Sequence, residues 1–162
     1  MELYVNMVPV YQHDPTVDQN QYHSIIIDGK RVQTGLKWQC VELARRYFLV
    51  TKGITFPSIP NAYDIFDLAH MIHFSSGKKV AIHKHHNGSI VKPTVGSLLL
   101  WGKEYDQNET GHVAVIIGIY PHSIQIMEQN NSTSHRTIPT YYNDKTNQFY
   151  IVEKHILGWI SI

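Results

Sequence analysis

The sequence predicts a single α+β domain, in which helices from the first half of the chain pack on an antiparallel β-sheet formed by the second half. Helical spacing of apolar residues is confined to the part before residue 80. After that residue the apolar segments are short, rich in β-branched or aromatic side chains, and separated by turns. At 162 residues, with 43% hydrophobic residues, the chain has the length and composition of one folded unit. We therefore expect residues 1–162 to form one domain, with an irregular lead-in over 1–23.

Two helices are expected after a short strand and turn. Ile25-Ile26-Ile27 runs into Asp28-Gly29, a dipeptide typical of tight turns. Trp38–Lys52 is the clearest helix, because its apolar residues recur at spacings of three and four and a glycine follows it. A second helix is expected from the start signal Ser58-Ile59-Pro60 to about His73.

The second half is expected to contain five strands, namely Val95–Trp101, His112–Ile119, Ile124–Gln129, Phe149–Val152 and Leu157–Ile162. Between the predicted helices and these strands, His83–His86 is a polar stretch that ends at Asn87-Gly88, which is typical of an exposed loop. No further residues stand near these histidines at metal-ligand spacing, so no metal site is expected there.

Composition and charge exclude several classes of protein. Cys40 is the chain's one cysteine, so neither an intramolecular disulfide framework nor a zinc site with several cysteines can form. A net charge of +1 gives no electrostatic reason to expect nucleic acid or an acidic membrane as a partner. No lysine or arginine precedes Lys30, and the longest apolar run, Val113–Tyr120, is too short to span a membrane. We therefore expect a cytoplasmic protein with no secretory signal and no membrane association.

Cys40 has two interpretations. It lies at the start of the predicted helix, where unpaired backbone N–H groups and the positive end of the helix dipole favour a thiolate, the nucleophilic form of cysteine. A lone cysteine is, however, more often a small buried apolar side chain. The residue pattern by itself leaves both interpretations open.

A nucleophilic cysteine needs a base, and among eleven histidines His112 lies on the most rigid predicted element. It opens a strongly apolar strand, although an isolated histidine at such a position is more often a surface or satisfied core residue. The next strand ends in Glu128-Gln129-Asn130, where Glu128 could orient the ring of His112. A glutamate in a strand would otherwise be expected to face solvent.

Strand register provides a test of this pair. His112 and Glu128 share one face of the sheet if paired residue numbers sum to an even value, such as 112 with 130. A two-residue turn between the strands would give an odd sum and put Glu128 on the opposite face. We therefore predict an odd-length loop or a bulge around Tyr120-Pro121-His122.

Three segments, in this order, resemble a known family: Lys37–Arg46 around Cys40, Thr110–Ile116 around His112, and Glu128–Asn130. They are similar to the amidase domain of glutathionylspermidine synthetase/amidase, which belongs to the cysteine, histidine-dependent amidohydrolase/peptidase (CHAP) group and has a papain-like fold. The separations agree with the family pattern, with 72 residues from Cys40 to His112 and 16 from there to Glu128. The resemblance covers most of the chain from about residue 24 onward and is poor around 78–93 and 131–148.

This resemblance implies a papain-like α+β fold and a thiol amidase that uses no metal and no organic cofactor. It makes Cys40 the nucleophile, His112 the base and Glu128 the orienting carboxylate. Gln39 and the Cys40 N–H are implied to form the oxyanion hole, and Asn130 corresponds to a position beside the active site that contacts substrate.

The resemblance also implies a small-molecule substrate, glutathionylspermidine or a similar glutathione–polyamine conjugate, which is cleaved to glutathione and spermidine. Arg45 is a candidate anchor for an anionic end of this substrate, although an arginine on a helix surface needs no function. The chain has no Gly-rich phosphate loop, so hydrolysis alone is implied, without ATP-dependent synthesis.

Two other functions remain open. Many CHAP domains are peptidoglycan amidases or endopeptidases, but the absence of an export signal and of a wall-binding module argues against that activity here. A catalytically silent binding module would keep the fold, but the cysteine, the histidine and the acid are all present.

Overall fold

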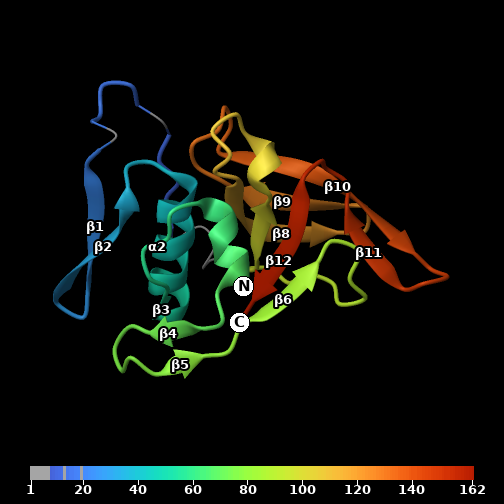
Figure 1. Cartoon of the computed structure of the whole chain (residues 1–162), viewed down its shortest axis with the longest axis horizontal. Helices are drawn as coiled ribbons and strands as arrows, with labels where there is room; N and C mark the ends of the chain where they lie inside the picture. Colours follow the sequence, from blue (N-terminus) through green and yellow to red (C-terminus); the bar gives the residue numbers. More distant parts are fainter. Residues whose placement is uncertain (1–7, 13, 19) are drawn as a thin grey trace.

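The structure is a computed structural model that describes residues 8–12, 14–18 and 20–162, and its architecture is α+β, as the sequence predicts. Residues 1–7, 13 and 19 of the predicted lead-in lie outside the described residues. The described part of the chain before Tyr22 contains turns and bends but no helix or strand. One helix and a β-hairpin lie beside a curled antiparallel sheet (Figure 1).

The N-terminal hairpin and the first helix agree with the sequence prediction. Strands β1 (Tyr22–Ile27) and β2 (Lys30–Leu36) are antiparallel and joined by Asp28-Gly29, whose φ angles of 49° and 74° suit a two-residue hairpin turn. Helix α2 (Cys40–Lys52) begins two residues later than expected and ends at Gly53. The left-handed backbone of Gly53 lets its N–H reach the last carbonyls of the helix.

The predicted second helix, from Pro60 to His73, is wrong. Its first part is a short 3₁₀-helix, η1 (Ala62–Asp67), and its last part is strand β4 (Met71–His73), which pairs between β3 (Ile54–Thr55) and β5 (Lys79–Val80). Ile65 of η1 and Met71 of β4 are both fully buried, so the apolar residues that imitate a helical stripe belong to two elements. Pairing with β3 and β5 overrides the helical spacing.

Seven antiparallel strands form the main sheet, in the spatial order β11, β10, β9, β8, β7, β12, β6 (Figure 1). Their bounds are His83–His86 for β6, Leu98–Trp101 for β7, His112–Tyr120 for β8, Ser123–Met127 for β9, His135–Asn143 for β10, Gln148–Ile151 for β11 and Ile156–Ser161 for β12. The five predicted strands are confirmed as β7, β8, β9, β11 and β12, with small shifts at their ends.

Two strands of this sheet depart from the prediction. The stretch His83–His86, expected to be an exposed loop, is instead the edge strand β6, which pairs with β12. The two strands approach closely because Gly158 has φ 155° and no side chain, and a Cβ at this position would collide with the carbonyl of His85. Strand β10 buries Ile138 alone and contains Pro139, so it lacks the usual pattern of a strand.

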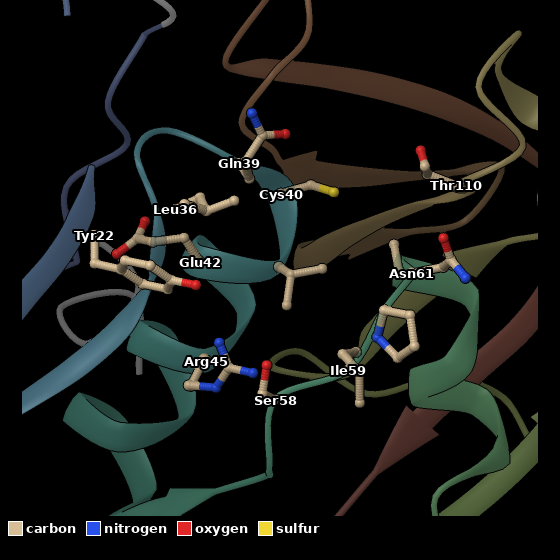
Figure 2. Close-up of a pocket in the computed structure, with 14 residues that line it drawn as sticks. Tyr22, Leu36, Gln39, Cys40, Glu42, Arg45, Ser58, Ile59, Asn61 and Thr110 are labelled. Atoms are coloured by element: carbon tan, nitrogen blue, oxygen red, sulfur yellow. The ribbon is translucent and has the colours of Figure 1, made fainter. Parts of the chain in front are cut away.

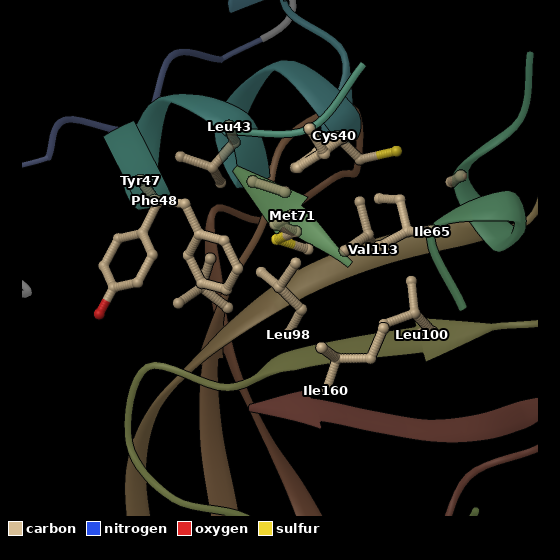
Figure 3. Close-up of a cluster of buried hydrophobic side chains, with 14 of the residues drawn as sticks. Cys40, Leu43, Tyr47, Phe48, Ile65, Met71, Leu98, Leu100, Val113 and Ile160 are labelled. Atoms are coloured by element: carbon tan, nitrogen blue, oxygen red, sulfur yellow. The ribbon is translucent and has the colours of Figure 1, made fainter. Parts of the chain in front are cut away.

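Buried side chains cover both faces of the sheet. On one face, α2 packs against β8 and η1 packs against β7 and β12 (Figure 3), with the buried residues Leu43, Phe48, Leu98, Leu100, Val113 and Ile160. On the other face, the alternate residues of the same strands form a second cluster that includes Leu99, Trp101, Ala114, Ile116 and Trp159. The 3₁₀-helix η2 (Lys103–Tyr105) follows β7. Within the described residues, no helix has the length and apolar character needed to cross a bilayer.

The register of β8 against β9 determines which of their residues share a face. Tyr120 pairs with Ser123, so the turn between the strands has two residues. A bulge at Ile117 then shifts the register by one residue, and Val115 pairs with Met127 beyond it. The predicted even sum is therefore confirmed. The irregularity that produces it lies inside β8, not at residues 120–122 as predicted.

Candidate active site

Cys40 is the first residue of α2, and its side chain lies where the helix end meets the start of β8. The residue is 8% exposed. Burial alone would raise the pKa of the Cys40 thiol, but attraction to His112 and a hydrogen bond with it outweigh burial and lower the pKa. Hydrogen bonds from the backbone N–H groups of Val113 and Val41 act in the same direction. The position therefore favours a thiolate, as the helix-start argument requires.

His112 is the first residue of β8 and is 3% exposed. Its Nε2 lies 2.7 Å from Oε2 of Glu128, which leaves Nδ1 as the ring nitrogen that faces the sulfur of Cys40. Burial alone would lower the pKa of His112, but the charge of Cys40, the hydrogen bond to it and the bond to Glu128 raise the pKa to about 9. A thiolate and an imidazolium therefore stabilise each other, and the two groups titrate as a pair.

Glu128 follows the last residue of β9 and is fully buried. The even register of β8 and β9 puts it on the same face as His112, opposite the face that α2 covers. Burial alone would raise the pKa of the Glu128 carboxyl, but hydrogen bonds from His112 and Arg136 outweigh burial and lower the pKa. Glu128 is thus an ionised acceptor that can fix the tautomer and orientation of the imidazole.

Gln39 and Asn130 meet beside this site. Gln39 is the residue before α2, and its Oε1 accepts a hydrogen bond of 2.8 Å from Nδ2 of Asn130. Because that bond occupies the oxygen, the amide nitrogen of Gln39 is the group left to donate. The Cys40 N–H belongs to the first turn of the helix, where backbone N–H groups have no acceptor within the helix. A shared role for these two donors in an oxyanion hole stays a prediction.

A groove of about 280 Å³ adjoins Cys40. Figure 2 shows the sulfur pointing toward Thr110, with Tyr22 and Leu36 of the hairpin on one side of the groove and Ile59 and Asn61 on the other. Polar and apolar groups both line it, so the groove can accept an extended, mixed ligand next to the sulfur.

Arg45 lines the same groove but is bound to the backbone around it. Its guanidinium donates hydrogen bonds to the carbonyl oxygens of Thr34, Phe56 and Pro57, and the residue is 9% exposed. Arg45 therefore ties the hairpin to the segment that follows β3. Its contact with an anionic end of the substrate stays a prediction.

The model of the CHAP domain family matches residues 31–130, which is more than half of the chain. The chain belongs to the CHAP domain family. It is 32% identical over 127 residues to the bifunctional glutathionylspermidine synthetase/amidase of Escherichia coli (strain K12), which covers 76% of this chain and 20% of the relative. The curled antiparallel sheet with one main helix agrees with the papain-like fold that the resemblance implies.

Two relatives from Crithidia fasciculata also match this CHAP domain. Trypanothione synthetase is 32% identical over 113 residues, covering 67% of this chain and 17% of the relative. Glutathionylspermidine synthase is 25% identical over 138 residues, covering 79% of this chain and 19% of the relative. The CHAP domain spans about a fifth of the length of the curated relatives it matches.

Gln129 is a residue of this CHAP domain that the sequence did not single out. It is 2% exposed, and its amide nitrogen donates to the carbonyl of Gln39 at 3.1 Å and to Oε2 of Glu42 at 2.9 Å. Its amide oxygen accepts from Arg46 and from the backbone N–H of Tyr11, both at 2.9 Å. Gln129 thereby fastens the start of α2 to the end of β9. Its partners are distant in sequence, so no local signal identifies it.

Two aromatic rings enclose His112. Tyr105, in η2, stacks on the imidazole with a centroid distance of 5.0 Å and an interplanar angle of 13°. Trp101, which pairs with His112 in the sheet, lies 5.1 Å from the same ring. The rings limit access of water to the bond between His112 and Glu128, which strengthens it.

Metal ligation has no support in the part of the chain that the structure describes, where no group of three or more His, Cys, Asp or Glu side chains could hold an ion.

Glu42 and Arg46, four residues apart on α2, form a buried ion pair at 2.8 Å, as helical spacing allows.

Proposed function

We propose that this CHAP domain is a thiol amidase and that Cys40 is its nucleophile. The observation that carries the proposal is the position of the sulfur, at the N-terminus of α2 and next to an imidazole that Glu128 holds at 2.7 Å. A thiolate that is both formed and aimed in this way is suited to attack a carbonyl carbon.

The proposed reaction has two halves. The Cys40 thiolate attacks the amide carbonyl, and the resulting oxyanion accepts hydrogen bonds from the Cys40 N–H and the Gln39 amide, each worth about 3–4 kcal/mol in a comparable enzyme. The imidazolium of His112 then gives its proton to the leaving amine as the C–N bond breaks, which leaves a thioester. His112 next takes a proton from water, whose oxygen attacks the thioester, and the acid product leaves as the Cys40 thiolate re-forms.

For the substrate we propose glutathionylspermidine or a similar glutathione–polyamine conjugate, cleaved to glutathione and spermidine. Two relatives that match most of this chain carry glutathionylspermidine in their names, and one of these names includes an amidase. Residues from the hairpin and from the 58–62 segment line the groove beside Cys40, so both can contact one ligand. Arg45 is proposed to face an anionic end of it, and Asn130 to lie at its side.

The test is product identification by mass spectrometry after incubation with glutathionylspermidine and, separately, with muropeptides. We expect glutathione and spermidine from the first mixture and no cleavage in the second. The Cys40→Ala variant should lose turnover while its circular dichroism spectrum stays that of the wild type. Undiminished hydrolysis by this variant would refute the mechanism. Cleavage of muropeptides alone would replace the polyamine conjugate with a peptidoglycan substrate, and no reaction with either would favour a silent binding module.

A further inference from the structure

Glu128 binds a second partner through the oxygen that does not face His112. Its Oε1 accepts a hydrogen bond of 2.6 Å from Nε of Arg136, while Oε2 is 2.7 Å from Nε2 of His112. The carboxylate is fully buried, so its orientation depends on these two donors and not on water. A carboxylate bound at one oxygen alone could rotate about its last torsion, whereas one bound at both oxygens keeps its plane.

Arg136 is itself held in place. Its Nη1 and Nη2 donate to the two oxygens of Glu153 at 2.6 and 3.0 Å, which is the fork-to-fork geometry of a paired arginine and carboxylate. Glu153 also accepts a hydrogen bond of 2.9 Å from the indole of Trp101. Because Trp101 lies against the ring of His112, the chain of contacts from His112 through Glu128, Arg136 and Glu153 returns to its starting point.

Stability alone does not account for this arrangement. The side chains of Arg136 and Glu153 are 27% and 24% exposed, and ion pairs with such access to solvent contribute little to folding. The buried part of this chain of contacts is the hydrogen bond between Glu128 and the imidazole, and the function of the arrangement is to be sought there. Arg136 comes from β10 and Glu153 follows β11, so these two elements support a bond between β8 and β9.

We propose that Arg136, braced by Glu153, is a positioning residue for His112: it fixes the Glu128 carboxylate so that Oε2 stays on Nε2 of the imidazole. This inference rests on the proposed roles of Cys40, His112 and Glu128. It assigns a function to β10, a strand that the sequence pattern did not reveal, because β10 carries the arginine that completes the site.

The two explanations predict opposite shifts of the His112 pKa in Arg136→Gln. If Arg136 acted by charge alone, Arg136→Gln would strengthen the field of Glu128, stabilise the imidazolium and raise the pKa of His112, and Glu153→Gln would lower it. If Arg136 acts by position, both variants loosen the bond between the imidazole and Glu128, so both lower the pKa of His112.

The test follows the titration of His112 by NMR from pH 5 to 11, with His112→Gln to assign its signal among the eleven histidines, and needs no substrate. We expect Arg136→Gln to lower the pKa of His112 by about one and Glu153→Gln to lower it by less. Arg136→Lys keeps the charge without the fork, so its value should lie between those of the wild type and Arg136→Gln. Lys154→Gln and Asp144→Asn, which make the same charge changes at exposed positions, should leave the profile unchanged.

Amide hydrolysis provides the second measurement. Arg136→Gln should lower kcat about tenfold with little change in KM, because the groove is lined by other residues. A raised or unchanged pKa of His112 in Arg136→Gln, with a lower Tm alone, would overturn the proposal, and so would an unchanged titration in Arg136→Lys if Arg136→Gln does not fold. A wild-type protein that cleaves no amide would defeat the proposed function, while the titration of His112 would still decide the role of Arg136.

Discussion

Glu42 is the centre of a buried hydrogen-bond network, and replacing it with glutamine should destabilise the fold by about 3–5 kcal/mol. Its carboxylate is fully buried and accepts hydrogen bonds at both oxygens. Oε1 accepts from Arg46, Thr34 and His23 at 2.7–2.8 Å. Oε2 accepts from Arg46 and Gln129 at 3.1 and 2.9 Å. The network therefore joins α2 to the hairpin and to the end of β9.

The magnitude follows from what a glutamine would do in this place. It keeps the size of Glu42 but replaces one acceptor oxygen by an N–H donor that faces other donors. Arg46, which is 2% exposed, would also lose its counter-ion. Breaking a buried ion pair costs about 3–5 kcal/mol because an uncompensated charge stays behind. For a chain of this length the cost corresponds to a fall in Tm of about 6–20 °C.

Thermal and urea unfolding, followed by circular dichroism, would measure this loss. Glu109→Gln is the matched control, because Glu109 is exposed, and it should change stability by less than about 0.5 kcal/mol. A Glu42→Gln variant within about 1 kcal/mol of the wild type at pH 7 would refute the reasoning, since a network of this kind would then be dispensable.

The wild type and Glu42→Gln also test how the stability of the fold depends on pH. Burial alone would raise the pKa of the Glu42 carboxyl, but hydrogen bonds from Arg46, Thr34 and His23 outweigh burial and lower the pKa below its usual 4.5. A lowered pKa contributes stability that is present above the unfolded-state value and is lost as the pH falls through the folded-state value. The difference in stability between the wild type and Glu42→Gln should thus be constant above about pH 4.5 and shrink below it.

Three further predictions concern the candidate site. Glu128→Gln removes a charge-assisted hydrogen bond worth about 1.5–3 kcal/mol, so the pKa of His112 should fall from about 9 by about one to two. The basic limb of the plot of kcat/KM against pH should move to lower pH with it. An unmoved limb would contradict the role of Glu128 as the orienting carboxylate. Asn130→Ala frees the Gln39 amide and should lower kcat several-fold while the alkylation rate of Cys40 stays the same, which separates loss of an oxyanion donor from loss of the thiolate. Peroxide should inactivate the protein reversibly through a sulfenic acid at Cys40, and failure of a thiol reductant to restore activity would count against this.

The parts of the fold that the sequence predicted are those with strong local signals. Helix α2 has an apolar stripe and a glycine at its end, and β8 is an apolar run of β-branched residues, so both were found within two residues. The helical spacing of segment 60–73 does not produce a helix, because Ile65 and Met71 are buried from different elements. Strand β6 is polar because it lies at an edge, where backbone pairing with β12 and not side-chain burial defines the strand.

The residues of the candidate site also differ in whether a local sequence signal identifies them. Cys40, His112 and Glu128 were proposed from short motifs and their spacing, and the structure brings these three side chains together. Gln129 and Arg136 could not be found in this manner, because each is a polar residue in or next to a strand whose partners depend on tertiary packing. Arg136 also lies in β10, where the resemblance to the family is poor and the strand pattern is weak.

The bulge at Ile117 has a consequence for anyone who redesigns this hairpin or aligns sequences across it. Deleting Ile117 itself would leave the pairs beyond the bulge unchanged, so the imidazole of His112 and the carboxylate of Glu128 would stay on one face of the sheet. Deleting one residue between His112 and Ile117 would instead shift the pairing by one, and the two groups would then point to opposite sides of the sheet. An engineer who shortens this part of β8 by a single residue would disconnect the acid from the ring without touching either side chain.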